Sequence, residues 1–180
     1  MYTSISKETA ERLFNDYSSY VFRVALFLTK SRELADDITQ ETFMKAFRKY
    51  ASYDPSRPFE PWIYKIAMNT ARNMYRRQKA AVLLDEAYEE ESGISVEENM
   101  LEREKRKILW REINCLGLRS REVIVLHFYS GLKLREIAQV LGIPVGTCKS
   151  RLNYALKTLR PRISGMDTTD RKGAAAYERI

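Results

Sequence analysis

Histidine and cysteine are nearly absent from this chain of 180 residues, which holds one His and two Cys. Cys115 and Cys148 are too few for a disulfide framework or for a four-ligand zinc site. Because His127 is the single histidine, most zinc chemistry and every Ser-His triad are excluded. We therefore expect no catalytic residue, no metal and no cofactor.

Glycine, proline and long apolar runs are also scarce. Seven Gly and five Pro argue against collagen-like, low-complexity and turn-rich all-β chains. The longest apolar stretch, Tyr20–Leu28, contains Arg23 and is too short to span a bilayer, and the N-terminus lacks the apolar run of a signal peptide. We expect a soluble, cytoplasmic protein with reduced thiols and no membrane insertion.

Positive charge is abundant: 31 Lys and Arg against 24 Asp and Glu give a formal net charge of +7. A basic chain of this kind favours a nucleic-acid partner, although net charge alone does not separate that role from a ribosomal or a membrane-surface one. The hydrophobic fraction of 44% is enough to build a core.

Apolar residues recur at three- and four-residue steps, which predicts an all-α fold with two small helical domains, residues 8–79 and 104–163. Ser31 is expected to cap the second helix. Three prolines make residues 53–61 a loop, and Pro61 suits the first turn of the helix that follows. Residues 80–103 are expected to form a flexible acidic linker, because nine acids stand against one base between Asp85 and Glu104, and residues 164–180 a flexible tail.

The strongest motif is a predicted helix-turn-helix in the second domain. Residues 134–142 form a short helix that ends at Gly142, where the turn needs a left-handed residue; Ile143-Pro144 turns the chain; and residues 145–157 begin a second helix. Ala138 is expected to be small because the second helix crosses over it.

The second helix of the motif is expected to bury Cys148 and Leu152 and to leave polar residues outward, as a helix that fits the major groove does. From Val145 to Arg162 there are five bases and no acid, whereas a solvated face usually mixes both signs. The alternative is an αα-hairpin of a structural bundle.

The first domain has a similar basic stretch, from Trp62 to Lys79, with five bases and no acid. Aromatic residues such as Tyr53 and Phe59 lie in the loop before it. Rings beside basic side chains suit single-stranded nucleic acid, whose unstacked bases stack on the rings. The alternative is that the rings are core and the bases a solvated face, which we favour for Trp62 alone.

An acidic cluster lies upstream, where Asp36 and Gln40, and Asp37 and Glu41, are each four residues apart on one helical side. It has three interpretations. One is a paired-carboxylate active site, for which nothing nearby supplies a third metal ligand. The others are an ordinary acidic helix N-terminus and a protein-docking face.

Two separate stretches resemble bacterial sigma factors of the small, two-domain extracytoplasmic-function group. Asp36–Phe43 followed by Phe59–Asn69 is similar to the family's region 2, and Arg121–Leu126 followed by Glu136–Ala138 and Gly142–Leu152 is similar to region 4. A helix-turn-helix alone is weak support, whereas both stretches in this order and spacing are strong support. One departure is Cys148, where the family usually has valine.

The resemblance implies three contact surfaces. The polymerase-binding surface, which meets the clamp helices of the β′ subunit, comprises Asp36, Asp37, Gln40, Glu41 and Phe43. The minus-10 DNA-binding surface comprises Arg57, Phe59, Tyr64, Lys65, Asn69, Arg72, Asn73, Arg76 and Arg77. The minus-35 DNA-binding surface comprises Thr147, Lys149, Ser150, Arg151, Asn153, Tyr154 and Lys157. The resemblance also implies contact with the flap of β and allows an anti-sigma factor as a further partner.

The predicted function is that of a non-enzymatic sigma factor, which binds core RNA polymerase, directs it to promoter DNA and assists opening. The predicted linker reaches at most about 80 Å when extended, so the two domains could occupy sites about two DNA turns apart. One rival is an operator-binding helix-turn-helix regulator, which leaves the acidic cluster and the loop 53–61 without a role. The other is a nuclease that uses the carboxylates.

Overall fold

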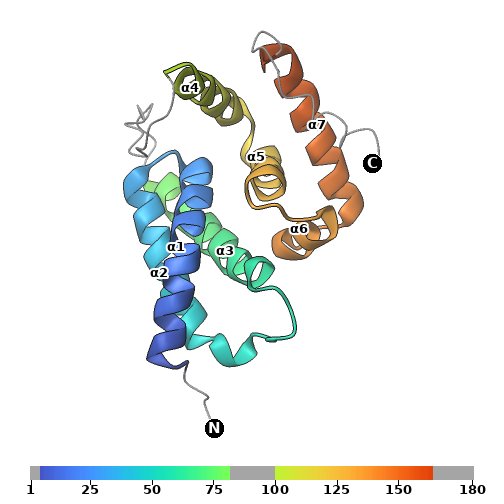
Figure 1. Ribbon diagram of the computed structural model, residues 1–180. Helices are drawn as coiled ribbons and strands as arrows, with labels where there is room; N and C mark the ends of the chain where they lie inside the picture. The colour runs from blue at the N-terminus through green and yellow to red at the C-terminus, as the bar shows by residue number, and fades with distance from the viewer. Residues whose placement is uncertain (1–4, 82–99, 164–180) are drawn as a thin grey trace.

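The computed structural model describes residues 5–81 and 100–163, and every regular element in these two ranges is helical (Figure 1). The first group of helices is α1 (Lys7–Thr29), α2 (Arg32–Arg48), the 3₁₀ turn η1 (Tyr50–Ser52) and α3 (Phe59–Ala81). The second group is α4 (Met100–Cys115), α5 (Leu118–Ile124), the π-helical turn η2 (Val125–Tyr129), α6 (Leu134–Leu141) and α7 (Val145–Ile163). The predicted all-α fold with two small helical domains is confirmed.

The predicted linker and tail lie largely outside the described residues. Of residues 80–103, the two ends belong to helices, since α3 runs on to Ala81 and α4 begins at Met100. Residues 82–99 and the predicted tail 164–180 lie outside the described ranges.

Local capping sets the hairpin of α1 and α2. The Ser6 hydroxyl accepts from the backbone N–H of Thr9 at the start of α1. Lys30 takes a left-handed conformation, with φ of 60°, and its N–H donates to the carbonyl of Leu26. Ser31 then caps α2 as predicted, its hydroxyl accepting from the N–H of Leu34. The chain thus reverses within two residues, and α1 packs against α2.

Helix α3 begins at Phe59, three residues earlier than the sequence predicted. Pro61 lies in the first turn of α3, where its missing N–H has no intrahelical partner to lose, so the proline is tolerated inside the helix. The helix then passes through the core of the first group, where Ile63 and Met68 are fully buried with Val21, Val24 and Ile38.

The helix-turn-helix of α6 and α7 has the predicted geometry. Gly142 ends α6 with φ of 66°, and its N–H donates to the carbonyl of Ala138. No atom would meet a side chain at Gly142, so this position calls for glycine because of its backbone conformation rather than for lack of space. Ala138 is buried, and α6 packs against both α7 and α3.

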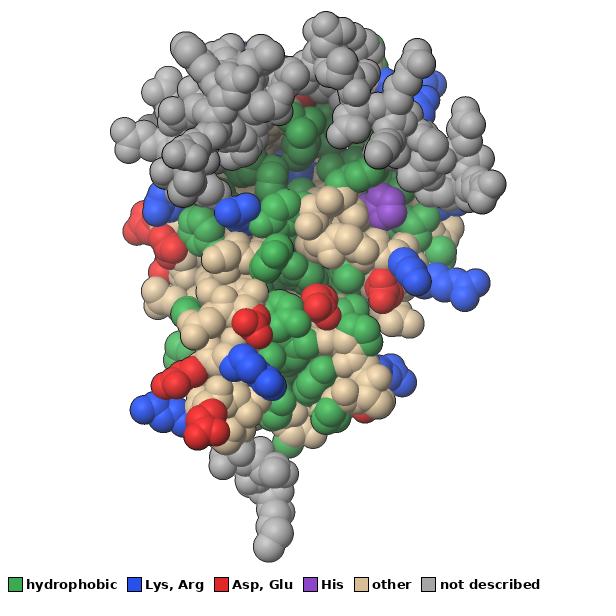
Figure 2. All heavy atoms as spheres, viewed as in Figure 1, with side chains coloured by type: hydrophobic (Ala, Val, Ile, Leu, Met, Phe, Trp, Pro, Cys, Tyr) green, Lys and Arg blue, Asp and Glu red, His purple; other side chains and the backbone are tan. Residues whose placement is uncertain are grey.

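The two groups of helices pack directly against each other. Helix α1 contacts α5 and η2, and α3 contacts α6. Phe27 of α1 lies against Trp110 and Tyr129, with ring centroids 4.3 and 5.8 Å apart. Figure 2 shows hydrophobic side chains in a band down the middle of one face, with Lys and Arg scattered around it. Within the described ranges, no helix is long and apolar enough to cross a membrane.

Candidate functional site

The acidic side of α2 is open to solvent. Asp36, Asp37 and Gln40 are exposed, and the Glu41 carboxylate forms an ion pair of 3.1 Å with Lys45, four residues along. Lys45 also donates to the hydroxyl of Thr70 on α3, which ties this side of α2 to the rest of the first group. The four predicted polar residues therefore form one accessible surface.

Phe43, the fifth residue of the predicted polymerase-binding surface, does not lie on it. Its side chain is 2% exposed and packs edge-on against Phe14, with centroids 4.9 Å apart, and against Phe47. The helical register explains the difference, because residues 35, 39, 42, 43 and 46 share the inner side of α2 while 36, 37, 40 and 44 face outward. Phe43 therefore packs in the core on the side of α2 opposite the acidic surface.

The loop between η1 and α3 is held by its own polar contacts. The hydroxyl of Tyr53 donates to the carbonyl of Arg57 over 2.6 Å. Asp54 accepts from the N–H and the hydroxyl of Ser56, at 3.0 and 2.7 Å, and pairs with the guanidinium of Arg57 at 3.2 Å. The hydrogen bonds from Ser56 hold the pKa of Asp54 below its ordinary value. Arg57 remains largely exposed at the loop tip.

Behind the loop stands a cluster of aromatic rings. Tyr53 packs edge-on against Phe59, and both rings contact Trp62, with centroids 5.3 to 5.4 Å apart. Phe59 is buried, contrary to its predicted place on the minus-10 surface, because α3 begins at this residue and turns its ring onto Tyr17. Burial and the hydrogen bond to Glu60 raise the pKa of Tyr17 to about 12.

The predicted minus-10 residues on α3 divide into an exposed and a covered set. Lys65, Asn69, Asn73 and Arg76 are exposed, and Arg76 donates to the side-chain oxygen of Asn73 at 2.7 Å. Tyr64 is instead 2% exposed, contrary to its predicted surface position, and burial raises its pKa. The side chain of Arg77 lies outside the described residues.

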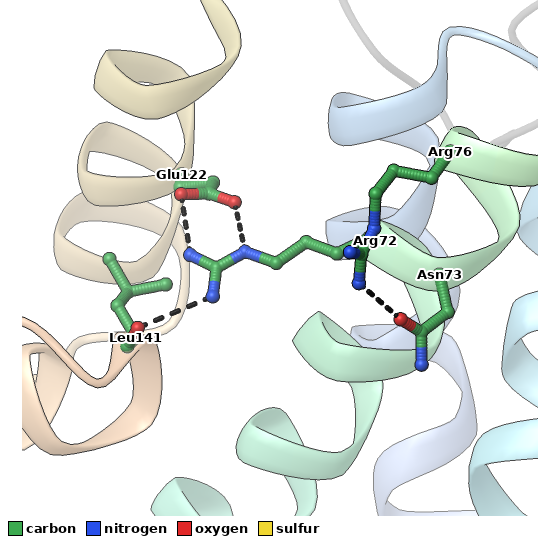
Figure 3. Close-up of polar contacts among 5 residues, drawn as sticks. All are labelled: Arg72, Asn73, Arg76, Glu122 and Leu141. Carbon is green, nitrogen blue, oxygen red and sulfur yellow. Dashed lines mark hydrogen bonds and ion pairs between the residues drawn. The ribbon is translucent and has the colours of Figure 1, made fainter. Parts of the chain in front are cut away.

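Arg72 reaches from α3 to the second group of helices (Figure 3). Its Nε and Nη2 donate to the two carboxylate oxygens of Glu122 at 2.7 and 2.8 Å, and its Nη1 donates to the carbonyl of Leu141 at 3.3 Å. The hydrogen bonds to Glu122 raise the pKa of Arg72. The sequence predicted a DNA contact at this residue, and the structure gives its guanidinium a carboxylate partner within the chain.

The outward side of α7 carries the predicted minus-35 residues. Lys149, Ser150, Asn153, Tyr154 and Lys157 are exposed, and Thr147 and Arg151 are partly so. On the inner side, Cys148 is fully buried and Leu152 is 2% exposed, as predicted. Burial raises the pKa of the Cys148 thiol, which keeps it neutral and apolar at that site.

Sequence reasoning assigned no role to Arg121 and Glu122, although both belong to the stretch that resembles region 4. Both are buried on α5. The guanidinium of Arg121 donates to the carbonyls of Phe27 and Leu28 in α1, each at 3.3 Å. The available signal was that these two adjacent charges stand directly before an apolar stretch, Val123–Leu126.

Comparison with known proteins identifies the family of this chain. Residues 13–81 match the family model described as sigma-70 region 2, and residues 106–159 match sigma-70 region 4. The chain is 35% identical over 157 residues to the ECF RNA polymerase sigma-E factor of Salmonella typhimurium, with 80% of this chain and 82% of the relative covered. The chain belongs to the ECF group of RNA polymerase sigma factors.

One further sequence relative and two solved structures are also similar to this sigma factor. It is 28% identical over 158 residues to the ECF sigma factor SigW of Bacillus subtilis, covering 82% of this chain and 84% of that one. The structure resembles CnrH in complex with the cytosolic domain of CnrY, with a TM-score of 0.65, 25% identity, and 88% and 90% of the two chains covered. It also shares its fold with RpoE of Bartonella quintana, in complex with the anti-sigma factor NepR, with a TM-score of 0.70, 21% identity, and 87% and 97% covered.

Proposed function

We propose that this chain directs core RNA polymerase to promoters and that its three surfaces divide the work. The observation that carries the proposal is the presence, in one chain of the sigma-70 family, of an exposed acidic side on α2, a pre-ordered aromatic loop before α3, and an exposed basic side on α7. An operator-binding regulator needs only the last of these. A sigma factor is an initiation factor, and the chemistry of RNA synthesis belongs to the polymerase.

The acidic side of α2 is proposed to bind the clamp helices of β′. Asp36, Asp37, Gln40 and Glu41 present carboxylates and an amide to solvent within two helical turns. Such a charged surface steers a basic partner into place and fixes its register. The second group of helices is proposed to meet the flap of β, for which Leu109 and Phe128 offer apolar surface, 40% and 45% exposed.

The loop 53–58 and α3 are proposed to hold the minus-10 strand once it is unpaired. Tyr53 and Trp62 lie beside the loop as partly exposed rings on which a base can stack, and Lys65, Asn69 and Arg76 follow along the helix. The loop is closed by the bond from Tyr53 to the Arg57 carbonyl before any DNA is present. Ordering the loop in advance removes an entropic cost that DNA binding would otherwise carry.

The exposed side of α7 is proposed to enter the major groove at the minus-35 element. Asn153 and Lys149 have side chains able to bond base edges, while Lys157 and Arg151 suit phosphates. An anti-sigma factor is a further partner that we propose, because two structural neighbours were solved with such a protein or with a cytosolic domain bound.

The test is promoter-directed transcription with purified core polymerase. We expect run-off transcripts only when the chain is added to core, and permanganate-reactive thymines near the start site only in that mixture. The free chain should bind promoter duplex weakly, at roughly 10⁻⁴–10⁻⁶ M, since each group of helices presents one small basic helix. Tight, specific duplex binding by the free chain, without opening in either mixture, would identify an operator-binding regulator instead.

A further inference from the structure

The two groups of helices share a charged contact that uses one of the proposed DNA-binding residues. Arg72 of α3 and Glu122 of α5 are fifty residues apart in sequence and form a two-pronged ion pair, with both oxygens of the carboxylate engaged (Figure 3). The Glu122 side chain is 3% exposed, whereas that of Arg72 is 30% exposed. A guanidinium fork that grips a carboxylate in this way has the geometry with which it would grip a phosphate.

We propose that Glu122 is a stand-in for DNA phosphate that holds Arg72 in a closed form of the chain, and that this arginine reaches DNA only when the two groups of helices separate. The inference rests on the proposed function, since it concerns the regulation of the proposed minus-10 surface. It makes Arg72 a residue with two mutually exclusive partners.

The closed form covers one side of α3 and leaves the neighbouring side open. Tyr64, Met68 and Arg72 are spaced by four residues and therefore lie on one side of the helix. Met68 is fully buried in the core of the first group, while Tyr64 is 2% exposed and its hydroxyl lies near Ser130 and Tyr129 of the second group. Lys65, which follows Tyr64, and Asn69, which follows Met68, are exposed. Separation would therefore uncover Tyr64 together with Arg72.

A second contact keeps the same faces together. Arg121, which precedes Glu122 on α5, donates to the carbonyls of Phe27 and Leu28 in α1, and also to those of Asn114 and Leu116. These α1 carbonyls belong to the last helical turn, whose partial negative charge favours a cation. The cavity beside Arg72, lined by Leu28, Ala71 and Leu118 among others, measures about 10 Å³, room for no more than one water. The faces are thus closely fitted.

The pair suits a reversible contact. When the two groups separate, both charges return to water, so neither is left buried without a partner. Opening therefore breaks the ion pair between Arg72 and Glu122 at a modest net cost in free energy. A phosphate can then bind Arg72 in place of Glu122. A buried ion pair adds little to stability but discriminates strongly between two arrangements of the chain.

The experiment compares the full-length chain with its E122Q variant. Spin labels at S52C and Q139C, with Cys115 replaced by Ser, report the distance between the two groups of helices. We expect the wild type to give the short distance and E122Q to shift the closed-to-open ratio by about tenfold or more, since a hydrogen bond to a charged group contributes roughly 1.5–3 kcal/mol. A 20-nucleotide single strand should bind E122Q up to about tenfold more tightly, as the competent form becomes more populated.

The matched control is E112Q. Glu112 pairs with Arg162 at 3.2 Å inside the second group, so the variant removes the same charge without touching the contact between groups. E112Q should leave both the distance and the strand affinity unchanged. The double variant R72Q/E122Q should be open yet lose the gain in affinity, because the released guanidinium is gone.

An unchanged distance in E122Q would overturn the closed form, and a gain in affinity that survives R72Q would overturn the masking of Arg72. If E122Q unfolds below the measuring temperature, the R72Q variant is used instead, because it removes the partly exposed partner of the same ion pair. An unchanged spin-label distance in R72Q would likewise overturn the closed form. The outcomes remain separable from the proposed function. If the chain failed to support promoter-directed transcription but E122Q still changed the spin-label distance, the proposed function would be overturned. The proposed role of the contact between Arg72 and Glu122 would remain.

Discussion

Reversing the charge of the acidic side of α2 is the most direct probe of polymerase binding. In the D37K/E41K variant, two exposed or half-exposed carboxylates become ammonium groups. Neither side chain contributes to the buried core of the first group. The change therefore alters the surface that a partner meets while the helix packing stays as it is.

The cost to folding can be worked out from one contact. Glu41 pairs with Lys45 at 3.1 Å, with about a third of each side chain exposed. Losing this pair and placing lysines at 37, 41 and 45, which makes two like-charge pairs four residues apart, costs about 1 kcal/mol in total, against a typical free energy of unfolding of about 5–15 kcal/mol. Like charges facing each other across an interface cost several kcal/mol, so binding to core polymerase should weaken by at least about 100-fold.

The assay is a binding titration of labelled chain against core polymerase, with thermal unfolding measured on the same samples. The matched control is E11K/D16K, which makes the same change in net charge on α1 and breaks a similar pair, between Lys7 and Glu11 at 3.7 Å. The control should bind as the wild type does. If D37K/E41K bound core polymerase with wild-type affinity while remaining folded, the acidic side of α2 would not be the docking surface.

Three further outcomes are expected. In the complex with polymerase, N153A should change the sequence preference at the upstream element by about 1–3 kcal/mol. R76A should instead weaken binding to all sequences and lower the slope of log K against log salt concentration by about one. Titrations over a series of promoters would measure both effects. Y53F removes the hydroxyl that closes the loop, so permanganate reactivity should fall while core binding stays constant; equal loss of both would point to misfolding. With a thiol reagent, the exposed Cys115 should react in the native chain, whereas Cys148 should react only after denaturation, because it is buried and its pKa is raised. Rapid reaction of both thiols in the native chain would contradict the packing of α7.

Features set by neighbouring residues could be predicted from the sequence. Ser31 and Gly142 were assigned correctly because capping and a left-handed turn depend on a few adjacent residues. The outward and inward sides of α7 followed from helical period alone, since a regular helix repeats its contacts every three or four residues. Phe43 and Phe59 were misplaced onto surfaces because their roles were transferred with a motif, whereas the register of α2 and the early start of α3 turn both rings inward.

Contacts between distant parts of the chain had no local signal. The stretches Trp62–Lys79 and Val145–Arg162 contain no acid, and from this the sequence suggested that their bases face nucleic acid. In the structure each stretch has a base paired with a carboxylate fifty residues away, Arg72 with Glu122 and Arg162 with Glu112. A count of charges along a segment therefore overestimates the charge that phosphate can reach.

The two pairs differ in what DNA binding would require of them. Arg162 and Glu112 lie in the same group of helices, and the side chain of Arg162 is 47% exposed, so phosphate can approach it without any rearrangement of the fold. Arg72 and Glu122 join different groups, so phosphate reaches that arginine only after the groups part. Each phosphate contact contributes about 0.7 to the salt slope for a single strand. The salt slope for single-strand binding by E122Q should therefore exceed that for R72Q/E122Q by about this amount. Equal slopes would mean that Arg72 contributes no phosphate contact in the open form.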